Sequence, residues 1–128
     1  MKLLLDTHAF LWFVWGHKNL SNTAQATISN PNNDVFLSAA SHWETAIKTS
    51  TGKLTLTAPF RVLIEQSMVK NNFRTLAIEV AHSDAIVGLS FHHRDPFDRM
   101  LVAQALVEQL SIVSADAQFD PYGVARIW

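Results

Sequence analysis

The sequence predicts an α/β fold, in which a single domain spanning residues 1–128 holds a parallel sheet of about five strands flanked by helices. Three observations support this prediction. A chain of 128 residues suits one domain with a substantial core. Hydrophobic residues make up 48% of the chain and charged residues 16%, a balance that excludes a disordered protein. Short apolar runs alternate with segments of helical periodicity, as in proteins whose parallel strands are joined by helices.

Five short apolar or β-branched runs are the predicted strands. The run Leu3–Leu5 in "MKLLLDTH" is apolar without alternation, which suits a strand covered on both faces. In a sheet of this kind, binding and catalytic groups gather outside the carboxyl ends of the strands. The predicted strands are Lys2–Asp6, Val35–Ala39, Arg74–Ile78, Leu110–Ser114 and Val124–Trp128.

Helical periodicity and helix-start signals occupy the segments between these runs. Ser21 is a favoured N-cap residue, and Pro59 and Pro96 suit the first turn of a helix. After Pro96, the apolar residues Phe97, Leu101 and Ala105 are four positions apart. The predicted helices are Ala9–Trp15, Ser21–Ser29, Ala40–Ser50, one beginning at Pro59, Val80–Leu89 and one beginning at Pro96.

Charge and composition exclude several classes of protein. A net charge of −1 argues against a strongly basic nucleic-acid-coating protein and leaves room for a local basic patch. The chain has no cysteine, which excludes disulfides and cysteine-based zinc sites and is compatible with the cytoplasm. Asp6 and His8 interrupt the first apolar stretch, which therefore fits neither a signal peptide nor a membrane span. No glycine-rich phosphate-binding motif is present.

Acidic residues follow two of the predicted strands. Asp6 comes directly after Leu3–Leu5, and Asp116 lies just past the fourth predicted strand. A carboxylate at the edge of an apolar core costs several kcal/mol unless a partner compensates its charge. For Asp6 the partner could be the start of a helix, a cationic side chain or a metal ion.

Further acids lie near predicted helix starts, each with a structural alternative to function. Glu44 could pair with Lys48 one helical turn later. Asp95 is placed as an N-cap before Pro96, whereas Asp98 could complement the helix dipole or project toward a cation. Asp120 precedes Pro121, which favours a turn.

Histidines and tryptophans are assigned structural roles. None of the six histidines forms an H-E-x-x-H pattern, and the neighbours His92 and His93 would diverge on a helix, so we do not expect a zinc site. We expect Trp12, Trp15 and Trp43 to be packing residues rather than platforms for stacked bases.

Four segments together resemble the PIN domain family. They are "LLLDTHAFLW", "SAASHWETAIK", "HHRDPFDRMLVAQA" and "IVSADAQFDPY", and their order and flanks are similar to those of the short VapC-type toxins of type II toxin–antitoxin pairs. The resemblance extends over nearly the whole chain, Met1–Trp128. It implies an endoribonuclease that depends on Mg²⁺, or alternatively Mn²⁺, and leaves a 5′-phosphate and a 3′-hydroxyl.

The resemblance carries the family's four acids onto Asp6, Glu44, Asp98 and Asp116. It implies that Asp6 and Asp116 bind the metal ion most directly, that Asp98 binds it through water or completes a second ion site, and that Glu44 orients or deprotonates the attacking water. In the third segment, the match to "DRMLVAQA" selects Asp98 over Asp95. The expected substrate-binding residues are Thr7, Lys48, Arg99 and Ser114, with Lys53 and Arg94 as further phosphate contacts.

The resemblance also implies partners, and two other functions remain open. A small antitoxin would block the acidic cleft with a basic side chain. A homodimer could use Phe13 and Trp15, for which packing in the core is an equal alternative. No membrane association is expected. One alternative is an RNA- or protein-binding module without catalysis. The other is a phosphatase with Asp6 as nucleophile, although such enzymes place a second Asp where this chain has His8.

Overall fold

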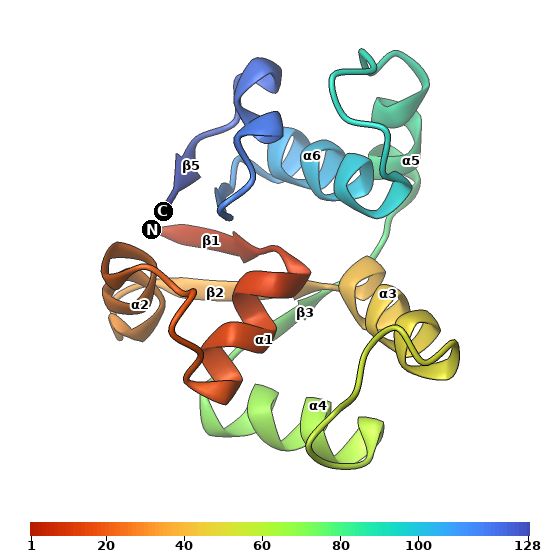
Figure 1. Cartoon of the computed structure of the whole chain (residues 1–128). Helices are drawn as coiled ribbons and strands as arrows, with labels where there is room; N and C mark the ends of the chain where they lie inside the picture. Colours follow the sequence, from red (N-terminus) through yellow and green to blue (C-terminus); the bar gives the residue numbers. More distant parts are fainter.

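The computed structural model describes residues 1–128 and contains one parallel sheet of five strands in the order β3-β2-β1-β4-β5 (Figure 1). All five predicted strands are confirmed; four are shorter than predicted, and the second has the predicted length but begins one residue earlier. The strands are β1 (Lys2–Leu5), β2 (Asp34–Ser38), β3 (Arg74–Leu76), β4 (Ser111–Val113) and β5 (Arg126–Ile127).

Helices cover both faces of the sheet and its carboxyl edge. Helices α1, α2 and α4 pack on one face, while α6 and the 3₁₀ helix η1 pack on the other (Figure 1). Helix α3 lies beyond the ends of the strands and packs against both α1 and α6. The helices are α1 (Thr7–Trp15), α2 (Asn22–Ser29), α3 (Ala39–Ser50), α4 (Phe60–Lys70), α5 (Val80–Val87), α6 (Pro96–Glu108) and η1 (Ala117–Tyr122).

Strand β1 is the centre of the core. Leu3 and Leu5 belong to the cluster on the α1 face and Leu4 to the cluster on the α6 face, and all three are 0% exposed. This two-sided burial explains the unbroken leucine run. The chain adds β2 and β3 on one side of β1 and then β4 and β5 on the other. The carboxyl end of β1 is therefore at the topological switch point, where open α/β sheets place their sites.

Helix starts follow the predicted capping chemistry. Ser21 caps α2 by accepting a hydrogen bond from the Ala24 amide, and Asp95 caps α6 by accepting from the Phe97 and Asp98 amides. Pro59 is the N-cap of α4, one position before the first helical turn in which it was expected.

The aromatic residues differ in burial. Trp43 is 63% exposed, and the packing contact that it makes is edge-to-face with Phe97 on α6. Phe13 and Trp15 are half-buried against the α1-side core, where Trp12 also packs, so of the two roles open for Phe13 and Trp15 the structure supports core packing. No helix has both the length and the apolar character needed to cross a membrane.

The burial of Leu4 gives a direct test of the core. We expect Leu4→Ala to lower the free energy of unfolding by about 2–5 kcal/mol, because it leaves a cavity beneath α6. Val69 is 82% exposed, so Val69→Ala should change stability by less than about 0.5 kcal/mol. Urea denaturation of both variants measures the difference, and equal stabilities would contradict the assigned core.

Candidate active site

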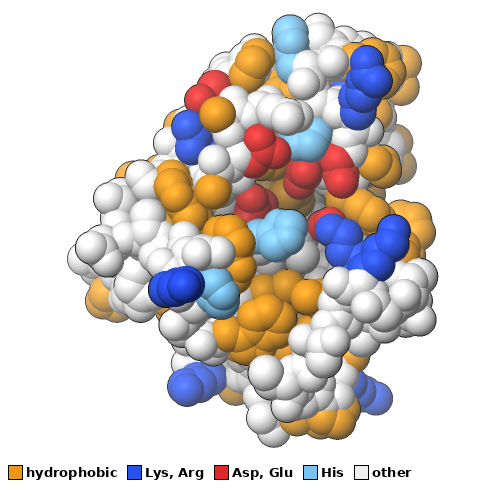
Figure 2. All heavy atoms as spheres, viewed as in Figure 1, with side chains coloured by type: hydrophobic (Ala, Val, Ile, Leu, Met, Phe, Trp, Pro, Cys, Tyr) orange, Lys and Arg blue, Asp and Glu red, His pale blue; other side chains and the backbone are white.

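The four predicted acids converge at the carboxyl edge of the sheet. Asp6 ends β1, Glu44 lies on α3, Asp98 lies in the first turn of α6, and Asp116 follows β4. Acidic side chains gather in a hollow on this face of the molecule (Figure 2). The charges of Asp6 and Glu44 both raise the pKa of Asp98, so these acids lie close together although they are far apart in the sequence.

Asp6 is both a helix cap and a member of the acid cluster. Its Oδ1 accepts a hydrogen bond of 2.7 Å from the Ala9 amide, and its Oδ2 accepts one from the Ser114 hydroxyl. The residue is only 8% exposed. Burial raises the pKa of Asp6, and the hydrogen bonds from Ser114 and Ala9 partly oppose that shift. Asp6 therefore caps helix α1 and also belongs to the acid cluster.

Ser114 links the first acid to the fourth. Its hydroxyl donates to Asp6 and accepts a hydrogen bond of 3.0 Å from the Asp116 amide. Ser114 is 0% exposed, so the prediction that it binds substrate is corrected. Its position instead orients the Asp6 carboxylate and the backbone that carries Asp116.

Glu44 is held by two of the predicted substrate-binding residues. The Thr7 hydroxyl donates to Glu44 Oε1 at 2.6 Å, and the Lys48 ammonium donates to Glu44 Oε2 at 2.6 Å. The hydrogen bond to Glu44 raises the pKa of Lys48. Thr7 is 5% exposed and is committed to Glu44, so it orients this carboxylate rather than meeting substrate. The Lys48 side chain is 33% exposed and keeps donors available for an incoming group.

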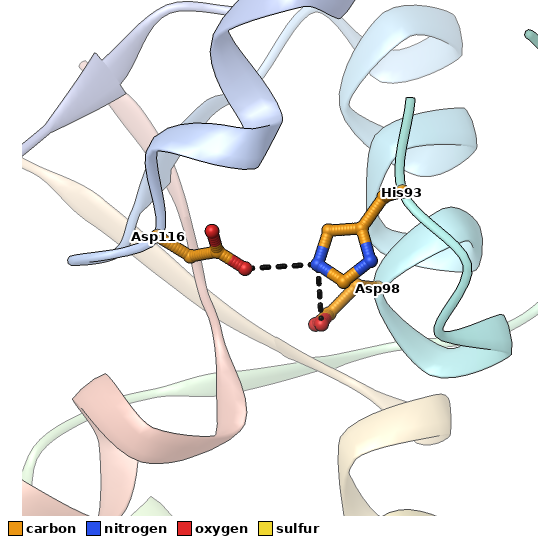
Figure 3. A group of neighbouring side chains, drawn as sticks. All are labelled: His93, Asp98 and Asp116. Carbon is orange, nitrogen blue, oxygen red and sulfur yellow. Dashed lines mark hydrogen bonds and ion pairs between the residues drawn. The ribbon is translucent and has the colours of Figure 1, made fainter. Parts of the chain in front are cut away.

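His93 is the site residue that the sequence analysis missed. Its Nε2 lies 2.8 Å from Asp116 Oδ2 and 3.0 Å from Asp98 Oδ2 (Figure 3). It lies in the loop before α6 and not on a helix, so the expected divergence from His92 does not apply. No metal-binding spacing marks it. The sequence feature that could have identified His93 is its position two residues before the N-cap Asp95, because the helix that follows has an acid in its first turn.

Hydrogen bonding assigns a role to His93. Its Nδ1 accepts a hydrogen bond of 3.2 Å from the Asp95 amide, so the neutral ring carries its proton on Nε2. Nε2–H is then directed at the carboxylates of Asp98 and Asp116. The three side chains lie close enough to hold a metal ion together. Because this tautomer has a proton on Nε2, we favour His93 as a hydrogen-bond donor to the two acids rather than as a metal ligand.

Asp98 is a second acid of the site whose pKa is raised. Burial, followed by the charge of Asp95, raises its pKa from 3.8 to about 7, and Asp6 and Glu44 add to the shift while His93 opposes it. Buried carboxylates that repel one another are stabilised by a hard divalent cation, which prefers oxygen ligands. The donor set therefore fits Mg²⁺ or Mn²⁺.

Arg99 does not contact substrate, contrary to expectation. It is 6% exposed, its guanidinium donates to the carbonyls of Ser90, Leu89 and His93, and it lies 4.0 Å from the Phe91 ring centroid. These contacts fix the loop that carries His93. Lys53 and Arg94 are exposed.

Asp95 and Asp120 have structural contacts, with the turn expected at Asp120 formed as the 3₁₀ helix η1. Asp95 is the N-cap of α6. Asp120 lies within η1, and its carboxylate pairs with the Arg126 guanidinium at 2.7 Å and 3.1 Å.

A family profile agrees with this arrangement. The PIN domain profile matches residues 3–124, nearly the whole chain. The protein belongs to the PIN domain family. No curated protein matches its sequence.

Several solved structures share the fold over nearly the full length of both chains. VapBC2 from Rickettsia felis, bound to a DNA fragment from its promoter, has a TM-score of 0.70 at 12% identity and covers 98% of this chain and 97% of its own. VapBC-1 from nontypeable Haemophilus influenzae has a TM-score of 0.69 at 14% identity, covering 98% and 96%. FitAcB from Neisseria gonorrhoeae has a TM-score of 0.66 at 20% identity, covering 97% and 95%.

The raised pKa of Asp98 predicts a pH-dependent effect on stability. Between pH 3.8 and about 7 the folded chain holds a proton that the unfolded chain has lost, so the free energy of unfolding falls as pH rises. In chelator, Asp98→Asn should therefore be more stable than the parent at pH 8, by on the order of 2 kcal/mol, and this gain should vanish below pH 3.8.

Urea denaturation at pH 3.5 and pH 8 measures this difference. Asp84→Asn is the matched control, because Asp84 is an exposed acid on α5 outside the cluster. Its stability relative to the parent should not depend on pH. A loss of stability in Asp98→Asn at pH 8 would contradict the assigned environment of Asp98.

Proposed function

We propose that this PIN domain protein is a metal-dependent endoribonuclease that hydrolyses RNA phosphodiesters. The observation that carries the proposal is the cluster of Asp6, Glu44, Asp98 and Asp116 at the switch point of the sheet, with the pKa of Asp98 raised to about 7. Like-charge groups gathered in this way need a cation, and a phosphodiester is a substrate whose charge such a cation offsets.

Asp6, Asp98 and Asp116 would hold Mg²⁺ or Mn²⁺. Each carboxylate oxygen accepts more than one bond, so Asp6 can keep the hydrogen bonds from Ala9 and Ser114 and still bind. When bound, the ion supplies positive charge that lowers the pKa of water and offsets charge on the phosphodiester. Asp98 and Asp116 are 23% and 37% exposed at the side chain, so both are open to an ion entering from solvent.

Glu44 would orient the attacking water and take its proton. Thr7 and Lys48 each hold one of its oxygens, which fixes the plane of the carboxylate. The water oxygen bonds to phosphorus as the bond from phosphorus to the 3′ oxygen breaks, and a proton passes to that oxygen. The products are a 5′-phosphate and a 3′-hydroxyl. The exposed part of Lys48 can contact a phosphate oxygen.

The residue two positions after Asp6 disfavours the phosphatase alternative. Enzymes with an aspartyl nucleophile place a second Asp two residues later, where this chain has His8. A covalent acyl-phosphate trapped on Asp6 would instead support the phosphatase. A binding module without catalysis is disfavoured because all four acids are present and held by specific partners.

We also propose that the protein is the toxin of a toxin–antitoxin pair. The structural relatives VapBC2, VapBC-1 and FitAcB support this proposal through their shared fold. The antitoxin would be a small protein that covers the acid cluster with a basic side chain. A homodimer acting in the cytoplasm is part of the same proposal.

Asp6→Asn tests the nuclease directly. We expect the parent to cleave a mixed RNA pool with Mg²⁺ or Mn²⁺ and to lose cleavage in chelator. Asp6→Asn should lower the rate at least about 100-fold, because the cluster loses a charge that holds the ion. Gel analysis of 5′-end-labelled RNA measures the cleavage.

Asp84→Asn is the control for this experiment, since it removes an exposed carboxylate outside the cluster and should cleave at the parental rate. Cleavage that persists in chelator and in Asp6→Asn would identify a contaminating nuclease. Metal-dependent cleavage missing from the pure parent protein would overturn the proposal.

The antitoxin proposal predicts inhibition by a neighbouring gene product. We expect the protein encoded by the adjacent reading frame to co-purify with this chain and to suppress RNA cleavage at equimolar concentration. Substituting a single Arg or Lys of that partner should restore cleavage without dissociating the complex. Full cleavage by the intact complex would contradict this proposal.

A further inference from the structure

We propose that His93 and Tyr122 are positioning residues of the metal site, because together they fix where Asp98 and Asp116 lie relative to each other. This inference rests on the proposed metal-dependent ribonuclease and adds two residues to it. Neither of them is one of the four acids that the family resemblance marks.

The hydrogen bonds of His93 join two acids that come from separate parts of the chain. Asp98 lies in the first turn of α6, whereas Asp116 follows β4. His93 Nε2 lies 3.0 Å from Asp98 Oδ2 and 2.8 Å from Asp116 Oδ2, and it and one oxygen of each acid all lie within 4.8 Å of one another (Figure 3). Without this shared donor the two carboxylates would repel each other. The Nε2–H group therefore sets their separation.

The His93 ring is held from its other sides. Its Nδ1 accepts a hydrogen bond of 3.2 Å from the Asp95 amide. Its centroid is 5.7 Å from that of the fully buried Phe119 ring. His93 is itself 8% exposed, so little water can compete for its hydrogen bonds. These contacts direct Nε2 at the acids before any ion is bound.

Tyr122 holds the loop that carries His93. Its hydroxyl accepts a hydrogen bond of 2.8 Å from the His93 amide and donates one of 2.7 Å to the Ser90 carbonyl. Tyr122 is the last residue of η1, the helix that Asp116 caps. On the other side, Arg99 of α6 donates to the same two residues, at the carbonyls of Ser90 and His93. The loop is thus tied to both elements that carry the acids.

This arrangement gives the two residues a role in metal binding without contact to the ion. Tyr122 acts through His93, and His93 acts through the two carboxylates. Hydrogen-bond partners of metal-binding side chains orient those side chains, and their loss commonly lowers metal affinity about 10- to 100-fold. We therefore expect the affinity for the ion to depend on a histidine and a tyrosine that do not bind it.

Mn²⁺ binding, measured by isothermal titration calorimetry without RNA, tests this role. We expect His93→Ala to weaken binding about 10- to 100-fold. His93→Gln keeps an N–H donor on a side chain of similar reach and should restore most of the affinity. Tyr122→Phe keeps the ring, loses both hydrogen bonds, and should weaken binding about 2- to 10-fold. His92→Ala is the matched control: His92 is an exposed neighbour with no hydrogen bond to either acid, and this variant should bind like the parent.

NMR of ¹⁵N-labelled histidine distinguishes a positioning donor from a metal ligand. His93 Nε2 should carry its proton in the metal-free protein and should keep it when Mg²⁺ is bound. Asp98→Asn should shift the Nε2–H resonance, because it changes the group that accepts this hydrogen bond. Asp84→Asn, which removes an exposed acid on α5, should leave the resonance unchanged.

Two results would overturn the positioning role. One is loss of the Nε2 proton when Mg²⁺ binds, which would make His93 a ligand. The other is parental Mn²⁺ affinity in His93→Ala and Tyr122→Phe; if urea denaturation shows that His93→Ala does not fold, Tyr122→Phe alone decides. A parent protein that binds Mn²⁺ but does not cleave RNA would overturn the ribonuclease and leave the positioning role in place, so the two failures are distinguishable.

Discussion

The burial of several carboxylates at one end of the sheet is the constraint on which the site depends. Asp6 and Glu44 are 8% and 5% exposed. Burial and the charges of Asp95, Asp6 and Glu44 raise the pKa of Asp98 to about 7. This arrangement is unfavourable without compensating charge, because desolvation and repulsion both oppose ionisation. The surrounding structure compensates by directing a hydrogen-bond donor at each buried oxygen.

Those donors come mainly from groups that also build the fold. Asp6 caps α1 and Asp116 caps η1, so each acid accepts a hydrogen bond from the backbone of the element it starts. Ser114 then ties Asp6 to the Asp116 backbone across the end of β4. The same hydrogen bonds therefore stabilise helix starts and fix the directions of the carboxylates, which couples the geometry of the site to the integrity of the fold.

A second layer of contacts fixes the opposite side of the cluster. The buried Arg99 guanidinium binds carbonyls of residues 89–93, and the Tyr122 hydroxyl accepts from the His93 amide at 2.8 Å. His93 is thereby held with Nε2 against Asp98 and Asp116. The guanidinium of Arg99 thus binds the loop that carries His93. The predicted role of Arg99 in binding phosphate was wrong for this reason.

The sequence by itself determined the alternation of strands and helices, the two-sided burial of Leu3–Leu5 and the caps at Ser21 and Asp95, because local patterns encode each of these. It also marked the four acids through their resemblance to a family. Only the tertiary structure decided what each polar side chain faces. The burial of Ser114 and Arg99, the position of His93 and the exposure of Trp43 depend on contacts between segments up to 108 residues apart, as in the hydrogen bond from Ser114 to Asp6. Such contacts leave no periodic signal in the chain.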